Sequence, residues 1–93
     1  MTTKYKLIFT APPLNLPKIK DAIFATGAGS YPGPGGYTEV CFTTPGVGQF
    51  KPGADANPHL GMPGKVEEVN EVRCEIFCNG NEVVKAAVAA LKR

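Results

Sequence analysis

Glycine and proline are concentrated in the middle of this 93-residue sequence, in two stretches that span residues 27–36 and 45–64. Glycine adopts backbone conformations that other residues avoid, and proline lacks an amide donor, so neither is favoured inside a helix or a central strand. Both stretches are therefore predicted to be loops. A loop as long as the second is uncommon in a compact domain and is typically a functional or interaction element. The regular elements must lie before, between and after these stretches.

A strand and a helix are expected before the first loop. Residues 4–10 alternate between apolar and polar, which predicts a strand that ends at Pro12-Pro13. Asn15 is expected to cap the following helix, and Gly27 to end it in the left-handed conformation. The predicted buried stripe of this helix has helical spacing and consists of Leu16, Ile19, Ala22 and Ile23.

Two strands and a second helix are expected in the remainder of the chain. Residues 38–44 and 66–78 show strand-like alternation. Because Val69 and Val72 have opposite phases, the longer strand is expected to carry a bulge or bend near Asn70. Asn81 is then the predicted cap of a helix that continues to the end of the sequence. Its predicted buried stripe consists of Val84, Ala87, Val88 and Leu91.

The resulting order of strand, helix, strand, strand, helix predicts an α+β fold of the ferredoxin-like split βαβ type. That fold has one more strand at its end. We expect this strand to be missing, or to be supplied by a tail or a neighbouring chain, because an open sheet edge favours aggregation. Residues 1–93 are expected to form one domain.

Charge and cysteine content exclude several classes of protein. The net charge of +2 is small and evenly spread, which argues against nucleic acid and membrane surfaces as partners. Three cysteines form an odd set, which favours reduced thiols over a disulfide framework. Neither a signal peptide nor an apolar run of membrane-spanning length is evident. We expect a cytoplasmic protein of a size that also permits nuclear entry.

No catalytic or cofactor-binding constellation is recognisable. Gly27-Ala-Gly29 follows a predicted helix and precedes a strand, which is the reverse of the order in a dinucleotide-binding loop. The one histidine, His59, lies four residues from Asp55, but zinc sites usually need three or four protein ligands, so no metal site is predicted. No serine or cysteine is paired with a base by sequence spacing. We therefore expect no cofactor and no enzymatic activity.

The second glycine-rich stretch carries the most specific pattern. Residues 44–52 read T-x-G-x-G-x-F-x-P, and residues 56–61 and 65–69 continue the pattern. Together these segments resemble the PII/CutA-like domain of the NIF-three-like family, whose members are also called GTP cyclohydrolase I type 2 homologues. In that family the domain is usually inserted into a larger metal-binding protein, although stand-alone versions exist. The ligands of the flanking metal domain have no counterpart in this chain.

The resemblance implies a ferredoxin-like subunit that forms homo-oligomers, typically trimers, with small-molecule sites between subunits. The loop between the second and third strands would mediate signalling, although the nucleotide-binding pattern of PII proteins is not matched. The leading hypothesis is a non-enzymatic binding, regulatory or interaction module. A metal-dependent hydrolase-like enzyme and a purely structural oligomerisation domain are the alternatives. The residues expected to line the ligand or interaction loop are Gly46, Gly48, Phe50, Pro52, Asn57, Pro58 and Gly61. No metal site is predicted, and His59 would be the candidate ligand only under the hydrolase-like alternative.

Overall fold

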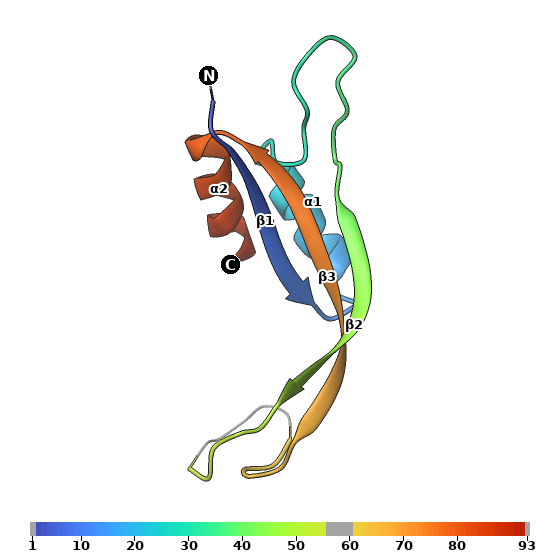
Figure 1. Ribbon diagram of the computed structural model, residues 1–93, viewed down its shortest axis with the longest axis vertical. Helices are drawn as coiled ribbons and strands as arrows, with labels where there is room; N and C mark the ends of the chain where they lie inside the picture. The colour runs from blue at the N-terminus through green and yellow to red at the C-terminus, as the bar shows by residue number, and fades with distance from the viewer. Residues whose placement is uncertain (1, 56–60, 93) are drawn as a thin grey trace.

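A computed structural model describes residues 2–55 and 61–92. Their elements follow the predicted order: β1 (Lys4–Ala11), α1 (Leu16–Phe24), β2 (Phe42–Phe50), β3 (Glu67–Asn79) and α2 (Asn81–Leu91). The strands form an antiparallel sheet in the order β1-β3-β2, so that β3 is central and the other two strands are edges. The chain is thus α+β, with both helices on one face of the sheet (Figure 1).

The core lies between the helices and the inner face of the sheet. Phe9 of β1 and the alternate residues Cys74, Ile76 and Cys78 of β3 are buried there, because successive side chains of a strand point to opposite faces. Ile23 of α1 is fully buried against them. The apolar alternation that predicted β1 and β3 is therefore the packing surface of the domain. Ala11, Leu16, Ala28 and Ala87 complete this core.

The two helices begin differently from what the sequence predicts. Asn15 does precede α1, but its side chain makes no capping hydrogen bond. The residue before α2 is Gly80, and Asn81 is already helical, with its side-chain Oδ1 accepting a hydrogen bond from the hydroxyl of Tyr5. Ala22, expected in the buried stripe of α1, is exposed, because the two helices do not close over it. Gly27 has the predicted positive φ, at 96°.

The second strand lies further along the chain than predicted. Residues 38–44 were expected to be extended, whereas β2 spans residues 42–50 and includes Pro45, Gly46 and Gly48 from the predicted loop. An edge strand tolerates proline, since an amide on its free side has no partner to lose. The backbone ladder to β3 continues through this segment, from Phe42 opposite Glu75 to Phe50 opposite Glu67.

Of the bulge or bend predicted near Asn70, the bulge is absent, since the pairing of β2 with β3 runs through this position one residue to one. The phase change instead marks the end of β1, whose last residue Ala11 pairs with Val72. Beyond this point β1 no longer pairs with β3 and no helix lies beside the two remaining strands. Side chains on the inner face therefore have no layer to pack against. Val69 is half-buried on the outer face instead.

Beyond β1, strands β2 and β3 continue as a two-stranded ribbon that projects from the body of the domain (Figure 1). We call residues 45–50 with 67–72 the ribbon. It gives the described chain its elongated shape, with extents of 53 × 22 × 19 Å. Neither described helix has the length and apolarity that crossing a membrane requires.

Candidate functional site

The predicted site residues fall into two groups along the ribbon. Gly46 and Gly48 lie within β2, near the end of β1. The second group consists of Phe50, Pro52 and Gly61 and lies where the ribbon meets the loop that joins its strands. The remaining predicted residues, Asn57, Pro58 and His59, lie outside the described residues.

The second group has packing contacts at the base of the loop. Pro52 is buried, and its carbonyl oxygen accepts a 2.7 Å hydrogen bond from the amide of Gly64. A Cβ atom on Gly61 would stand 2.5 Å from Cγ of Glu67 and 3.4 Å from a ring carbon of Phe50. These contacts close the loop onto the ribbon. A role for the same residues on a functional surface stays a prediction.

The first group borders a cleft on the outer face of the sheet, where β1 ends and the ribbon begins. Its volume is about 310 Å³. Gly46 and Gly48 leave its floor open, and a Cβ atom on Gly46 would meet no other atom within 4 Å. The polar side chains around it come from all three strands. They are Thr10, Thr44, Glu71 and Arg73, and we call this space the ribbon cleft.

Glu71 lies in the ribbon cleft because of its two neighbours. The hydroxyl of Thr10 donates a 3.3 Å hydrogen bond to one carboxylate oxygen. The other oxygen lies over Gly48, where any side chain would overlap it. Glycine at position 48 therefore provides the space that the carboxylate occupies. No ion pair is found for Glu71 within residues 2–55 and 61–92.

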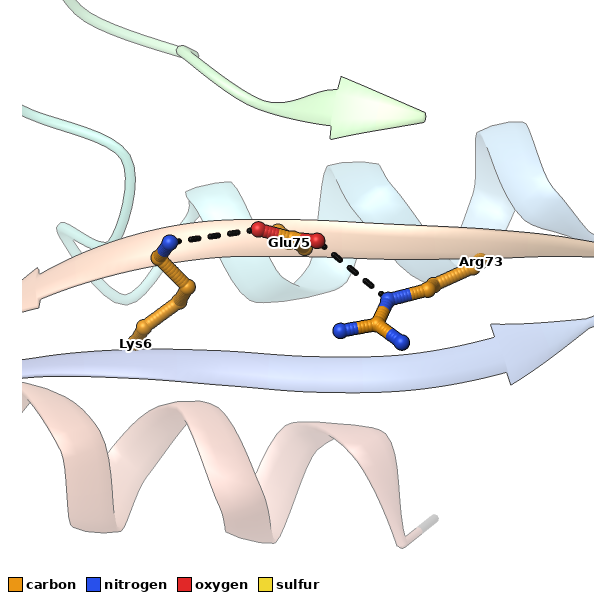
Figure 2. A network of polar contacts seen from close by, with 3 residues as sticks. All are labelled: Lys6, Arg73 and Glu75. Carbon is orange, nitrogen blue, oxygen red and sulfur yellow. Dashed lines mark hydrogen bonds and ion pairs between the residues drawn. The ribbon is translucent and has the colours of Figure 1, made fainter. Parts of the chain in front are cut away.

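Arg73 is part of a charged network on the same face (Figure 2). Its Nε lies 3.2 Å from one oxygen of Glu75, and Nζ of Lys6 lies 3.3 Å from the other. The two terminal nitrogens of the guanidinium point away from Glu75 in this view. They have no hydrogen-bond or ion-pair partner in the part of the chain that the structure describes. Arg73 therefore retains donors for a further acceptor.

Metal-binding side chains do not converge within the described ranges, which contain no group of three or more His, Cys, Asp or Glu residues. His59 lies outside these ranges, and Asp55 is exposed. The cysteines pack in or against the core: Cys74 and Cys78 are fully buried, and Cys41 is half-buried.

The thiol of Cys74 is held in its neutral form. Burial raises the pKa of this thiol from 9.0 to about 11, and the neighbouring Cys41 adds to the effect. Burial also raises the pKa of Cys78, against a smaller opposing effect of a backbone hydrogen bond from Leu7. Because the thiolate is the reactive form, burial protects both thiols in two ways: it blocks access to the sulfur atoms and it keeps them protonated.

We expect a maleimide at neutral pH to modify Cys41 well before the two buried thiols, because Cys41 alone is partly accessible. Mass spectrometry of peptides from the native protein measures the order. All three thiols should react at similar rates in denaturant. Equal rates for Cys41 and Cys74 in the native protein would contradict the buried position of Cys74.

The raised pKa also gives the stability a pH dependence. Above about pH 9 the Cys74 thiol ionises in the unfolded chain, whereas in the folded chain it stays protonated up to about pH 11. We expect its contribution to stability to be complete below pH 9 and to fall between pH 9 and pH 11. Urea titrations at several pH values measure this loss, and Cys74→Ala should reduce it.

Known proteins resemble this chain over most of its length. The GTP cyclohydrolase 1 type 2 homologue of Halalkalibacterium halodurans is 31% identical over 88 residues, which are 95% of this chain and 23% of that protein. That of Listeria monocytogenes is 39% identical over 70 residues, 75% of this chain and 18% of that protein. A crystal structure of a Bacillus cereus protein related to NIF3 covers 96% of the chain with a TM-score of 0.67 and 28% identity. The chain is homologous to one segment of the NIF3-like proteins.

This NIF3-like segment spans about a quarter or less of its relatives: 23% and 18% of the two curated proteins and 22% of the solved chain. No protein-family model matches its sequence. The resemblance found in residues 44–52 is thereby confirmed. The name of these relatives describes proteins about four times as long as this chain.

Sequence reasoning missed the polar side chains of the NIF3-like ribbon cleft. Thr10, Glu71 and Arg73 belong to the polar phases of the predicted strands at residues 4–10 and 66–78, and this pattern carries no signal of a site. Their alternation placed them on the outer face correctly. The missing information was the register, which sets Thr10 and Thr44 on either side of Arg73.

Proposed function

We propose that this chain is a non-enzymatic binding or regulatory module of the NIF3-like type, with a PII/CutA-like subunit fold, that forms homo-oligomers. The observation that carries the proposal is the open sheet. Within the described ranges, β1 and β2 each pair only with β3, so each leaves one edge of backbone donors and acceptors without a strand partner. Such edges are sites at which another chain adds to a sheet.

The outer face of the sheet supports assembly as well. Both helices pack on the inner face, so the outer face is left uncovered by them (Figure 1). Phe42 of β2 is 66% exposed there, and Ile8 of β1 is 47% exposed. Beside them Tyr31 stacks on Phe77, with ring centroids 4.7 Å apart. Aromatic side chains at the core of a patch and charges around it are typical of protein interfaces.

A trimer is the oligomer that the PII/CutA-like proposal favours. Light scattering should then give three times the 9.8 kDa mass of the chain. A monomer at every concentration, together with no thermal shift in a panel of metabolites and nucleotides, would overturn the proposal. Turnover of GTP by the metal-loaded protein would instead favour the hydrolase-like alternative, which rests on the name of the relatives.

We expect Phe42→Lys to lower the oligomer affinity by roughly tenfold or more, because it places a charge on the exposed face of an edge strand. The new ammonium would lie opposite Glu75, so the fold itself should persist. Leu14→Lys is the matched control: Leu14 is 95% exposed in the connection between β1 and α1, away from the sheet. Sedimentation velocity over a concentration series measures both variants, and equal behaviour would contradict assembly through β2.

A further inference from the structure

Cys41 and Cys74 are free thiols that meet on the inner face of the sheet. Cys41 directly precedes β2, in which Thr43 pairs with Cys74. Because successive side chains of an extended chain alternate, Cys41 shares the face of Thr43 and therefore that of Cys74. It packs against the core to which Cys74 belongs. The interactions between these two side chains include a hydrogen bond, so their sulfur atoms are neighbours.

The pair is accessible from solvent at one of its two members. Cys74 is fully buried, whereas Cys41 is half-buried and borders a surface cavity of about 320 Å³ beside Phe42 and Phe77. A small reagent therefore meets Cys41 first. The sulfur of Cys74 is shielded from reagents in solution, but it lies next to whatever group forms on Cys41.

We propose that Cys41 and Cys74 are a modification site, at which a hydroperoxide produces a reversible disulfide within the chain. The sulfur of Cys41 attacks one oxygen of the peroxide, the O–O bond breaks, and a sulfenic acid and one water form when hydrogen peroxide is the oxidant. The sulfur of Cys74 then attacks the sulfur of the sulfenic acid. The S–O bond breaks, the S–S bond forms, and the hydroxyl leaves with the proton of Cys74 as a second water. The two thiols lose two electrons, and the peroxide gains them.

The third cysteine does not take part in this pair. Cys78 lies on β3 with Cys74, four residues further along, so their Cα atoms are separated by roughly 13 Å. Disulfides require about 4.4–6.8 Å. Burial and a backbone hydrogen bond from Leu7 account for the pKa of Cys78, with no part from Cys41. The Sγ of Cys78 instead lies 3.8 Å from the carbonyl oxygen of Ile76.

The disulfide would close a covalent ring around the ribbon. Counted inclusively from Cys41 to Cys74, the ring has 34 residues and contains β2, the ribbon and the loop that joins its strands. A cross-link around a loop of this length restricts the unfolded chain, so we expect oxidation to raise the Tm by roughly 10 °C or more. The predicted loop residues all lie inside the ring. The inference thus adds a regulation to the proposed binding role without depending on that role.

Treating the full chain with hydrogen peroxide, and then stopping the reaction with catalase, tests the proposal. The intact mass should fall by two hydrogen atoms, and unreduced peptide maps should show Cys41 joined to Cys74. Dithiothreitol should restore the original mass and Tm. Added oxygen on Cys41 without a disulfide, a bond to Cys78, or a bond between two chains as the main product would each overturn the proposal.

Two variants identify the pair. Cys41→Ser changes a half-buried position, so the fold should persist, but peroxide should no longer remove two hydrogen atoms or raise the Tm. Cys78→Ala is the matched control, because it removes another fully buried thiol of β3. It should retain both effects of peroxide, measured against its own reduced form. A peroxide-induced rise in the Tm of Cys41→Ser, or its loss in Cys78→Ala, would contradict the pairing.

This proposal and the oligomeric module fail separately. The bond forms within one chain, so its rate should not change with protein concentration, whereas oligomer formation does. A strictly monomeric protein that forms the bond would contradict the oligomeric module alone. Oligomers that form without the bond, after peroxide treatment, would contradict the disulfide alone.

Discussion

Replacing Ile76 by alanine is expected to lower the free energy of unfolding by about 2–5 kcal/mol. Ile76 is fully buried in the middle strand of the sheet, where it pairs with Leu7. The substitution removes three carbon atoms and leaves a cavity that a sheet held by β1 and β2 cannot close. In a domain of this size the loss is a large fraction of the total stability. Urea unfolding followed by circular dichroism measures it.

Ile8→Ala is the matched control for this prediction. Ile8 lies on β1, one position from Leu7, but its side chain points to the outer face and is 47% exposed. The same atoms are removed without a buried cavity, so a loss below about 1 kcal/mol is expected. Similar losses for the two variants would show that the outer face is also buried, as it would be inside a stable oligomer. Measurement at low protein concentration distinguishes that outcome.

The order of elements was predictable from the sequence because local signals separate them. Alternation marked β1 and β3, helical spacing marked α1 and α2, and Gly27 marked the turn after α1 with the expected positive φ. Each of these signals depends on residues near one another in the chain. Their success therefore says that local preference and tertiary packing agree in these elements.

The position of β2 was not predictable in the same way. Pro45, Gly46 and Gly48 are poor strand residues, and local preference assigned them to a loop. Their extended conformation follows from pairing with β3, a contact between segments distant in sequence. The same holds for Asn81, whose preference for a cap is displaced by a hydrogen bond with Tyr5 from the other end of the chain. Both errors arise where a non-local contact overrides a local preference.

The ribbon cleft shows the same limit for function. Sequence similarity drew attention to Gly46 and Gly48, which form its floor, but gave no reason for their small size. The structure provides one, since Gly48 makes room for the carboxylate of Glu71. The residues that give the cleft its chemistry stand on three strands and are joined only by the register. Residues close together in sequence, such as Gly46 and Gly48, can therefore be identified from a sequence motif, whereas charged residues brought together from different strands cannot.

Gly29→Ala is expected to destabilise the protein by about 3 kcal/mol, from two separate causes. Gly29 has a φ of 78°, which is unfavourable for alanine. Its Cβ would also stand 2.9 Å from the carbonyl oxygen of Val40 and 2.8 Å from a ring carbon of Phe24. The backbone cannot move freely to relieve the overlap, because Gly29 donates a 2.7 Å hydrogen bond to Phe77 and accepts one of 2.9 Å from Val40.

Gly27→Ala separates these two causes. Gly27 has a similar positive φ, at 96°, but a Cβ there would meet no atom within 4 Å. Only the conformational cost remains, about 1–2 kcal/mol. Thermal and urea unfolding of both variants give the difference, which measures the close approach of the chain at Gly29 to Val40, just before β2. If Gly27→Ala were as destabilising as Gly29→Ala, the close contacts around Gly29 would add nothing to the conformational cost.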